Sequence, residues 1–122
     1  MQFNKEIRME KMNVKPATGK LGVLCVGLGA VTSTFMTGVL MARKGLAKPV
    51  GSMTQYDKMR VGRGENKKYL HYGEIVPLAT LDDIVFGAWD VYPANAYESA
   101  VNAEVLQEKD ILPVKEELEK IV

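Results

Sequence analysis

The stretch that decides the fold is Leu21–Thr32, which reads LGVLCVGLGAVT. Its first six residues form an apolar run with the length and composition of a buried strand. Two glycines follow, Gly27 and Gly29, and apolar residues then recur at helical spacing as far as residue 43. A basic last turn followed by glycine is a common helix stop, and here it is Lys44-Gly45. The pattern therefore predicts a strand over 21–26, a tight turn, and a helix from about 31 to 44.

The glycine turn is typical of a site for a dinucleotide phosphate. Gly27 permits a sharp strand-to-helix turn, and Gly29 allows bare backbone to approach a pyrophosphate. The free N–H groups at the start of the helix add positive partial charge. Thr32 stands at the third fingerprint position in place of Gly or Ala, so helix and strand are expected to lie slightly further apart. The alternative is an ordinary strand-to-helix turn that contains two glycines.

A second parallel strand is expected over Ile84–Asp90, between Asp82-Asp83 and Pro93. Asp90 falls at its carboxyl end, where dinucleotide folds place an acid that accepts hydrogen bonds from the adenosine ribose and disfavours a 2′-phosphate. The spacing from the glycine turn exceeds the plain fingerprint of roughly 20 residues, and we attribute the excess to an insertion. The competing interpretation of Asp90 is the cap of the next helix.

The predicted fold class is α/β: a partial Rossmann-like parallel sheet with flanking helices and a long insertion after the first strand–helix unit. Residues 1–19 are expected to form an N-terminal arm, and residues 20–122 a partial dinucleotide-binding domain with only two parallel strands. Residues 47–80 form the insertion, which is polar and irregular in sequence. We favour a solvated or subunit-contacting role for its basic group over nucleic-acid binding, because few aromatics are interleaved with the basic residues. That group is Lys58, Arg60, Arg63, Lys67 and Lys68.

Apolar spacing assigns faces to the helices. Val31, Phe35, Val39 and Ala42 are expected to face the sheet, with Met36 and Leu40 beside them. A helix over Asn95–Leu106 carries Tyr97, Val101 and Val105 four residues apart, and a final helix starts at Pro113.

Composition limits the possible functions. The 122 residues suit one domain. The 16 basic and 15 acidic residues leave a net charge of +1, so the overall charge does not indicate nucleic-acid binding. The single cysteine, Cys25, is expected to be a buried small hydrophobe; with one histidine, His71, it excludes a zinc cluster built by this chain alone. The uncharged run Leu21–Ala42 is long enough to cross a bilayer, but its glycines and hydroxyl residues favour a strand, a turn and a helix.

Four segments together resemble the myo-inositol-phosphate synthase family. They are Val26–Gly29, Gly51–Gln55, Asp83–Val91 and Asn95–Ala100, the last leading to Val105-Leu106. Asp83–Val91 is the most specific, since Gly87-Ala88-Trp89-Asp90-Val91 is close to the family's Gly-Gly-Trp-Asp-Ile signature. The resemblance extends from about Lys20 to the end and accounts for the long insertion.

The resemblance implies an isomerase that converts glucose 6-phosphate to myo-inositol phosphate, with tightly held NAD oxidising the sugar, aldol ring closure, and return of the hydride. It also implies a cytoplasmic homo-oligomer, a tetramer, acting in inositol and phospholipid biosynthesis. The family's catalytic lysines belong to a downstream domain that we expect to be absent here, so no catalytic residue is assigned and the chain alone is expected to be inactive. A non-catalytic dinucleotide-binding or assembly module is the competing class. Carried over by position, the cofactor-binding residues are Gly27, Leu28, Gly29, Ala30, Val31, Thr32 and Asp90.

One departure from the family pattern concerns the turn itself. Where the family commonly has Gly-Gly-Asn-Asn-Gly-Ser-Thr after its first Gly-Leu, this chain has Gly29–Thr34, one residue shorter and without the asparagines. The resemblance therefore supports backbone contacts to a phosphate more than side-chain contacts.

Overall fold

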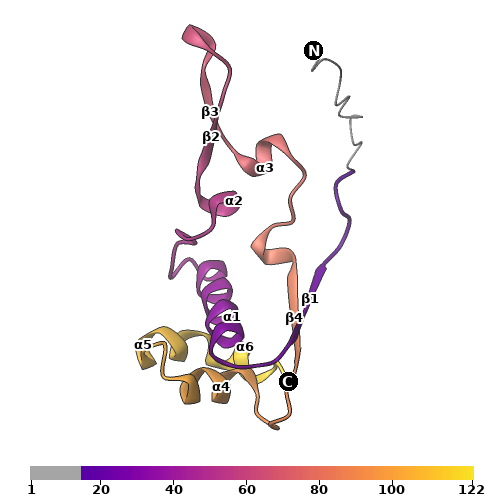
Figure 1. The fold of residues 1–122 in the computed structure, drawn as a ribbon, viewed down its shortest axis with the longest axis vertical. Coiled ribbons are helices and arrows are strands. Elements are labelled where there is room, and N and C mark those ends of the chain that lie inside the picture. The colour runs from indigo at the N-terminus through magenta and orange to yellow at the C-terminus, as the bar shows by residue number, and fades with distance from the viewer. Residues whose placement is uncertain (1–14) are drawn as a thin grey trace, which may run out of the picture.

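The computed structural model describes residues 15–122, so most of the expected arm, residues 1–14, lies outside the described residues. The principal elements run from a strand and a long helix, through a small hairpin unit, to a second strand and a set of short helices (Figure 1). In chain order they are β1 (Leu21–Val26), α1 (Ala30–Arg43), α2 (Met53–Tyr56), β2 (Lys58–Val61), η1 (Gly64–Asn66), β3 (Lys68–His71), α3 (Tyr72–Ile75), η2 (Leu81–Asp83), β4 (Ile84–Trp89), α4 (Ala96–Ala103), α5 (Glu108–Ile111), η3 (Leu112–Val114) and α6 (Lys115–Glu119).

The strands β1 and β4 pair in parallel, which confirms the predicted α/β fold with a two-stranded parallel sheet. Their register runs from Leu21 opposite Ile84 to Val26 opposite Trp89. Because side chains alternate along a strand, one sheet face points to the helices and the other does not. The helices gather on one side of this pair in Figure 1. The opposite face is apolar and exposed within the described chain: Leu24 is 71%, Val26 85% and Trp89 65% exposed.

The hydrophobic core lies between α1 and the helices that follow β4. Cys25, expected to be a buried small hydrophobe, packs against this core but is only half-buried, because a two-stranded sheet covers its own strands incompletely. The buried members are Leu28, Met36, Leu40, Ala96, Ala100, Ile111, Val114, Leu118 and Ile121.

The predicted face of α1 is only partly correct. Met36 and Leu40, expected beside the main stripe, are buried together with Val39 of that stripe, whereas Val31 is 84% exposed. The reason is that α1 packs chiefly on α4 and the C-terminal helices. Phe35 does meet the sheet, since its ring lies edge-on to that of Phe86 at 5.5 Å.

The helix predicted over Asn95–Leu106 is shorter than expected. It ends at Ala103 because Glu104 adopts a left-handed conformation, with φ of 54°, and breaks the helical hydrogen-bond pattern. Ala96 and Ala100 are buried and Tyr97 packs against the core, while Val101 and Val105 are exposed, so the four-residue spacing of Tyr97, Val101 and Val105 does not mark the buried face. At the C-terminus, Pro113 lies in the first turn of η3 and α6 follows directly, in agreement with a helical segment starting at that proline.

The insertion is more regular than its sequence implied. β2 and β3 form an antiparallel hairpin, with Met59 opposite Leu70 and Arg60 opposite Tyr69, and α2 and α3 lie at its base. This hairpin projects away from the sheet and helices (Figure 1). The signal that was available is the polar–apolar alternation over Lys58–Val61, followed by Gly62 and Gly64, which are typical of a turn.

Arg43, in the last turn of α1, joins that helix to the start of β4. Its Nε donates to the Leu81 carbonyl at 2.6 Å and its Nη2 to the Ile84 carbonyl, and the guanidinium lies 5.8 Å from the centre of the Phe86 ring. The uncharged run that precedes Arg43 is divided between β1 and α1. Within residues 15–122, no helix is long and apolar enough to span a membrane.

Candidate dinucleotide-binding site

The glycine turn follows directly from the end of β1. Gly27 has φ of +99°, which side-chain-bearing residues rarely adopt, and its N–H donates to the Trp89 carbonyl at 2.7 Å. The next residue, Leu28, turns its side chain into the core and is 5% exposed. Any contribution of Leu28 to a ligand must therefore come from its backbone.

The start of α1 presents unpaired donors. Gly29 is the N-cap in an extended conformation, and the first helical hydrogen bond runs from the Ser33 N–H to the Gly29 carbonyl at 3.0 Å. No acceptor within residues 15–122 takes the N–H groups of Ala30, Val31 and Thr32, and the first turn carries no acidic residue. Such a helix start favours an anion.

The space over Gly29 is open. A Cβ placed there would meet no atom within 4 Å, so nothing in the described protein requires a glycine at this position. Gly29 and Ala30 are exposed, Val31 is exposed and Thr32 is half-buried. The glycine leaves the backbone uncovered on the side from which a phosphate would approach.

Asp90 follows β4, and its side chain contacts the glycine turn. Its Oδ2 accepts the Leu28 N–H at 2.7 Å, and its Oδ1 accepts the Tyr92 N–H at 3.2 Å. These donors, the Leu28 N–H foremost, hold the pKa of Asp90 below its ordinary value and keep the carboxylate ionised. Because each carboxylate oxygen has two lone pairs, acceptor capacity remains for a hydroxyl group.

Asp90 is not the cap of the following helix. Asn95 has that role, since its Oδ1 accepts the Glu98 N–H at 2.9 Å and the Glu98 Oε2 accepts the Asn95 N–H at 3.0 Å. The capping interpretation of Asp90 is therefore wrong. Its carboxylate faces the glycine turn instead.

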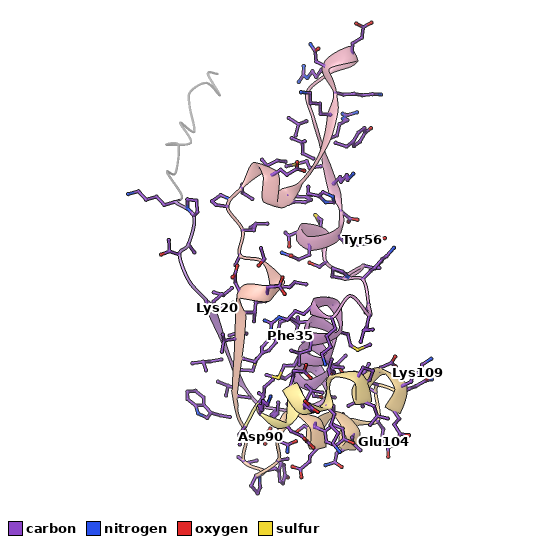
Figure 2. The ribbon with its side chains drawn as sticks, turned by 180° about the vertical axis from the view of Figure 1, so that it is seen from behind. Lys20, Phe35, Tyr56, Asp90, Glu104 and Lys109 are labelled. Carbon is purple, nitrogen blue, oxygen red and sulfur yellow. The ribbon has the colours of Figure 1, made fainter. Side chains whose placement is uncertain are left out.

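A cavity of about 310 Å³ opens where these parts meet, at the carboxyl ends of β1 and β4. It is lined by Leu28, Gly29 and Ala30 of the turn and by Asp90, which Figure 2 labels at this end of the sheet. Ser99 and Asn102 of α4 also line it. Sequence reasoning missed these two polar side chains, because only the packing of α4 beside the turn brings them to the cavity.

The structure thus brings the turn residues and Asp90 together. The hydrogen bond between Leu28 and Asp90 joins residues that are 62 positions apart in the sequence. Unpaired N–H groups lie beside a fixed carboxylate at the carboxyl ends of two parallel strands. Open α/β sheets bind their ligands at this edge. The arrangement suits a pyrophosphate over the helix start and a hydroxylated sugar toward the acid.

Comparison with known proteins agrees with this geometry. An NAD-binding family model described as myo-inositol-1-phosphate synthase matches residues 21–122. The chain is 56% identical over 112 residues to inositol-3-phosphate synthase 1 of Bacteroides thetaiotaomicron, and this match covers 91% of this chain and 25% of that protein. It is 32% identical over 114 residues to inositol-3-phosphate synthase isozyme 1 of Arabidopsis thaliana, covering 81% and 22%.

Among solved structures, the inositol-3-phosphate synthase of Caenorhabditis elegans matches with a TM-score of 0.72 and 27% identity. The match covers 88% of this chain and 24% of that one. The chain therefore spans about a quarter of the length of these relatives.

Proposed function

Because the chain belongs to the myo-inositol-1-phosphate synthase family, whose matching segment is an NAD-binding one, we propose that the cavity at the carboxyl ends of β1 and β4 binds the adenosine diphosphate half of NAD. One observation carries the proposal: Asp90 lies 2.7 Å from the Leu28 N–H, beside the unpaired N–H groups of the helix start. Residues 20–122 then act as part of a dinucleotide-binding domain, with the insertion at 47–80 outside the site.

Each residue of the site has a proposed role. The N–H groups of Gly29–Thr32 hold the pyrophosphate, since they lie at the positive end of α1 and those of Ala30, Val31 and Thr32 have no acceptor within residues 15–122. Gly27 and Leu28 form the turn, and Asp90 both fixes that turn and accepts the adenosine ribose hydroxyls. A 2′-phosphate in that position would meet the Asp90 carboxylate, so NAD is favoured over NADP.

The role of the complete enzyme is proposed from the family. We infer that the segment serves an isomerase that converts glucose 6-phosphate to inositol phosphate in a cytoplasmic homo-oligomer, a tetramer by the family resemblance. When bound, NAD would supply reversible hydride transfer for that reaction. The described residues of this chain supply cofactor binding, and we assign no proton-transfer group among them.

The test is calorimetric titration of the 122-residue chain with NAD and with NADP. We expect NAD to bind and NADP to bind more weakly, and Asp90→Asn to weaken NAD by about ten- to hundredfold, the scale of a lost charge-assisted hydrogen bond. Asp83→Asn is the matched control, because Asp83 interacts with Thr80 and Lys20 far from the cavity. Equal affinity of the wild type for the two cofactors, or unchanged NAD affinity in Asp90→Asn, would remove Asp90 from the site.

A further inference from the structure

The two ends of the molecule carry opposite charge. The hairpin segment 57–71 holds five basic residues against two acidic ones, and the helical segment 96–122 holds seven acidic residues against three lysines. Figures 1 and 2 show the hairpin at one end of the long axis and α4 and α5 at the other. The ion pairs within residues 15–122 are Lys20–Asp83, Lys44–Glu117 and Lys115–Glu119, and none of them uses a cation of the hairpin.

The hairpin has a cationic face built around an aromatic ring. Arg60 lies opposite Tyr69 and Lys58 opposite His71, and residues paired in this way share a face of the hairpin. Tyr69 is 59% exposed, and Lys58 and Arg60 are exposed. Met59 and Leu70 alternate to the other face and are half-buried.

The opposite end of the molecule has a groove of complementary chemistry. It lies between α4 and α5, has a volume of about 360 Å³, and is lined by apolar side chains, Tyr97, Val101, Leu106, Ile111 and Leu112 among them. Glu104 and Glu108 complete its lining. Neither carboxylate forms an ion pair with a residue of the described chain. An apolar groove with two carboxylates suits an aromatic ring flanked by cations.

We propose that this groove docks the Lys58–Arg60–Tyr69 face of the hairpin of a second copy of the chain. The hairpin cannot reach the groove of its own molecule, because the two lie at opposite ends (Figure 1). In an antiparallel pair of copies each hairpin meets the other copy's groove, so one two-fold axis produces the contact twice. Tyr69 enters the groove, and Arg60 and Lys58 face Glu104 and Glu108. The cofactor site takes no part in this contact.

The inference predicts a charge-dependent dimer. Sedimentation velocity of the full 122-residue chain is expected to show a dimer whose dissociation constant rises at least tenfold from about 50 to 300 mM salt, since the contact depends on exposed charges. Lys58→Glu with Arg60→Glu should yield a monomer, and so should Glu104→Lys with Glu108→Lys. An equimolar mixture of these two variants should restore the dimer, because both contacts then join opposite charges. Lys15→Glu with Lys48→Glu, outside both surfaces, is the matched control and should stay dimeric. Circular dichroism checks that each variant is folded.

Other outcomes would overturn the inference. They are a monomeric wild type at all concentrations tested, failure of the mixture to restore the dimer, and a dimer that persists in both charge-reversed variants. The last result would assign association to the exposed sheet face of Leu24, Val26 and Trp89. If Lys58→Glu with Arg60→Glu abolished oligonucleotide binding and left sedimentation unchanged, the hairpin would be a nucleic-acid surface instead.

Discussion

At the scale of single residues, the site depends on backbone groups more than on side chains. The Leu28 side chain lies in the core, while its N–H holds the Asp90 carboxylate at 2.7 Å. Gly29 leaves the adjacent backbone open. Side-chain identity matters chiefly at Asp90, which joins the end of one strand to the turn that follows the other.

The first residue-scale prediction concerns the charge of Asp90. Hydrogen bonds from the Leu28 and Tyr92 N–H groups lower the pKa of Asp90, so their stabilising effect is present above the unfolded-state pKa of about 3.9 and is lost as pH falls through the folded-state pKa. The Leu28 amide proton, followed by NMR, is therefore expected to report a pKa of Asp90 below the ordinary aspartate value. Asp90→Asn should abolish this titration. A midpoint at or above the ordinary value in the wild type would show that the hydrogen bond is weak in solution.

The second residue-scale prediction separates the two glycines. Gly27→Ala places a side chain at φ of +99° and should lower the free energy of unfolding by about 1–3 kcal/mol, measured by urea denaturation. Gly29→Ala has no such strain and meets open space, so the fold should keep its stability. The added methyl group would nevertheless obstruct a pyrophosphate, and NAD affinity should fall at least tenfold. Unchanged affinity in Gly29→Ala would move the phosphate away from this turn.

At the scale of elements, the sheet and the first helix were predictable because their signals are local. Leu21–Val26 is a strand as its apolar run indicates, and α1 begins at Ala30, one residue from the predicted start. The hairpin was missed because its strands have only four residues each and polar–apolar alternation is present in Lys58–Val61 but not in Lys68–His71. The helix faces were partly wrong because partners decide which side is buried: α1 packs chiefly on α4 and the C-terminal helices, and it meets the sheet through Phe35. Nothing local in the sequence indicates that Ser99 and Asn102 reach the cavity.

Arg43 provides the prediction at this scale. It ties the end of α1 to the carbonyls of Leu81 and Ile84, which fixes where the insertion ends and β4 begins. Arg43→Met keeps much of the aliphatic contact but leaves these carbonyls without the guanidinium. The free energy of unfolding is expected to fall by about 1–3 kcal/mol in urea denaturation. Lys48→Met, outside this contact, should change it little, and equal effects of the two variants would refute the proposed role of Arg43.

At the scale of the whole molecule, the described chain combines the proposed cofactor site with one exposed sheet face. Leu24, Val26 and Trp89 present an apolar surface of the kind that marks an interaction site. Among the residues that line the cavity, Asp90 is the one charged group, and its carboxylate is held by backbone donors. The proposed site is suited to binding and orienting a cofactor, whereas a sugar isomerase also requires groups that move protons.

The whole-molecule prediction is that the purified 122-residue chain does not convert glucose 6-phosphate to inositol phosphate. Its NAD affinity is expected to be weak, with a dissociation constant on the order of 0.1 mM or higher, because ordering a turn beside an uncovered sheet consumes binding energy. A coupled assay for inositol phosphate and a calorimetric titration measure the two quantities. Turnover above a control without protein would mean that proton-transfer groups lie within this chain and were missed.

The parallel pairing of β1 with β4 also determines the order in which the chain can acquire its structure. The two strands meet only after the whole insertion is bridged, as the 62 positions between Leu28 and Asp90 show, and such distant contacts form slowly. The hairpin of β2 and β3 is local, and hairpins form in about 1–10 μs. Once formed, it shortens the segment that must be closed and lowers the entropic cost of bringing β1 to β4. The insertion is thus expected to fold first and to bring the two halves of the proposed nucleotide site together afterwards.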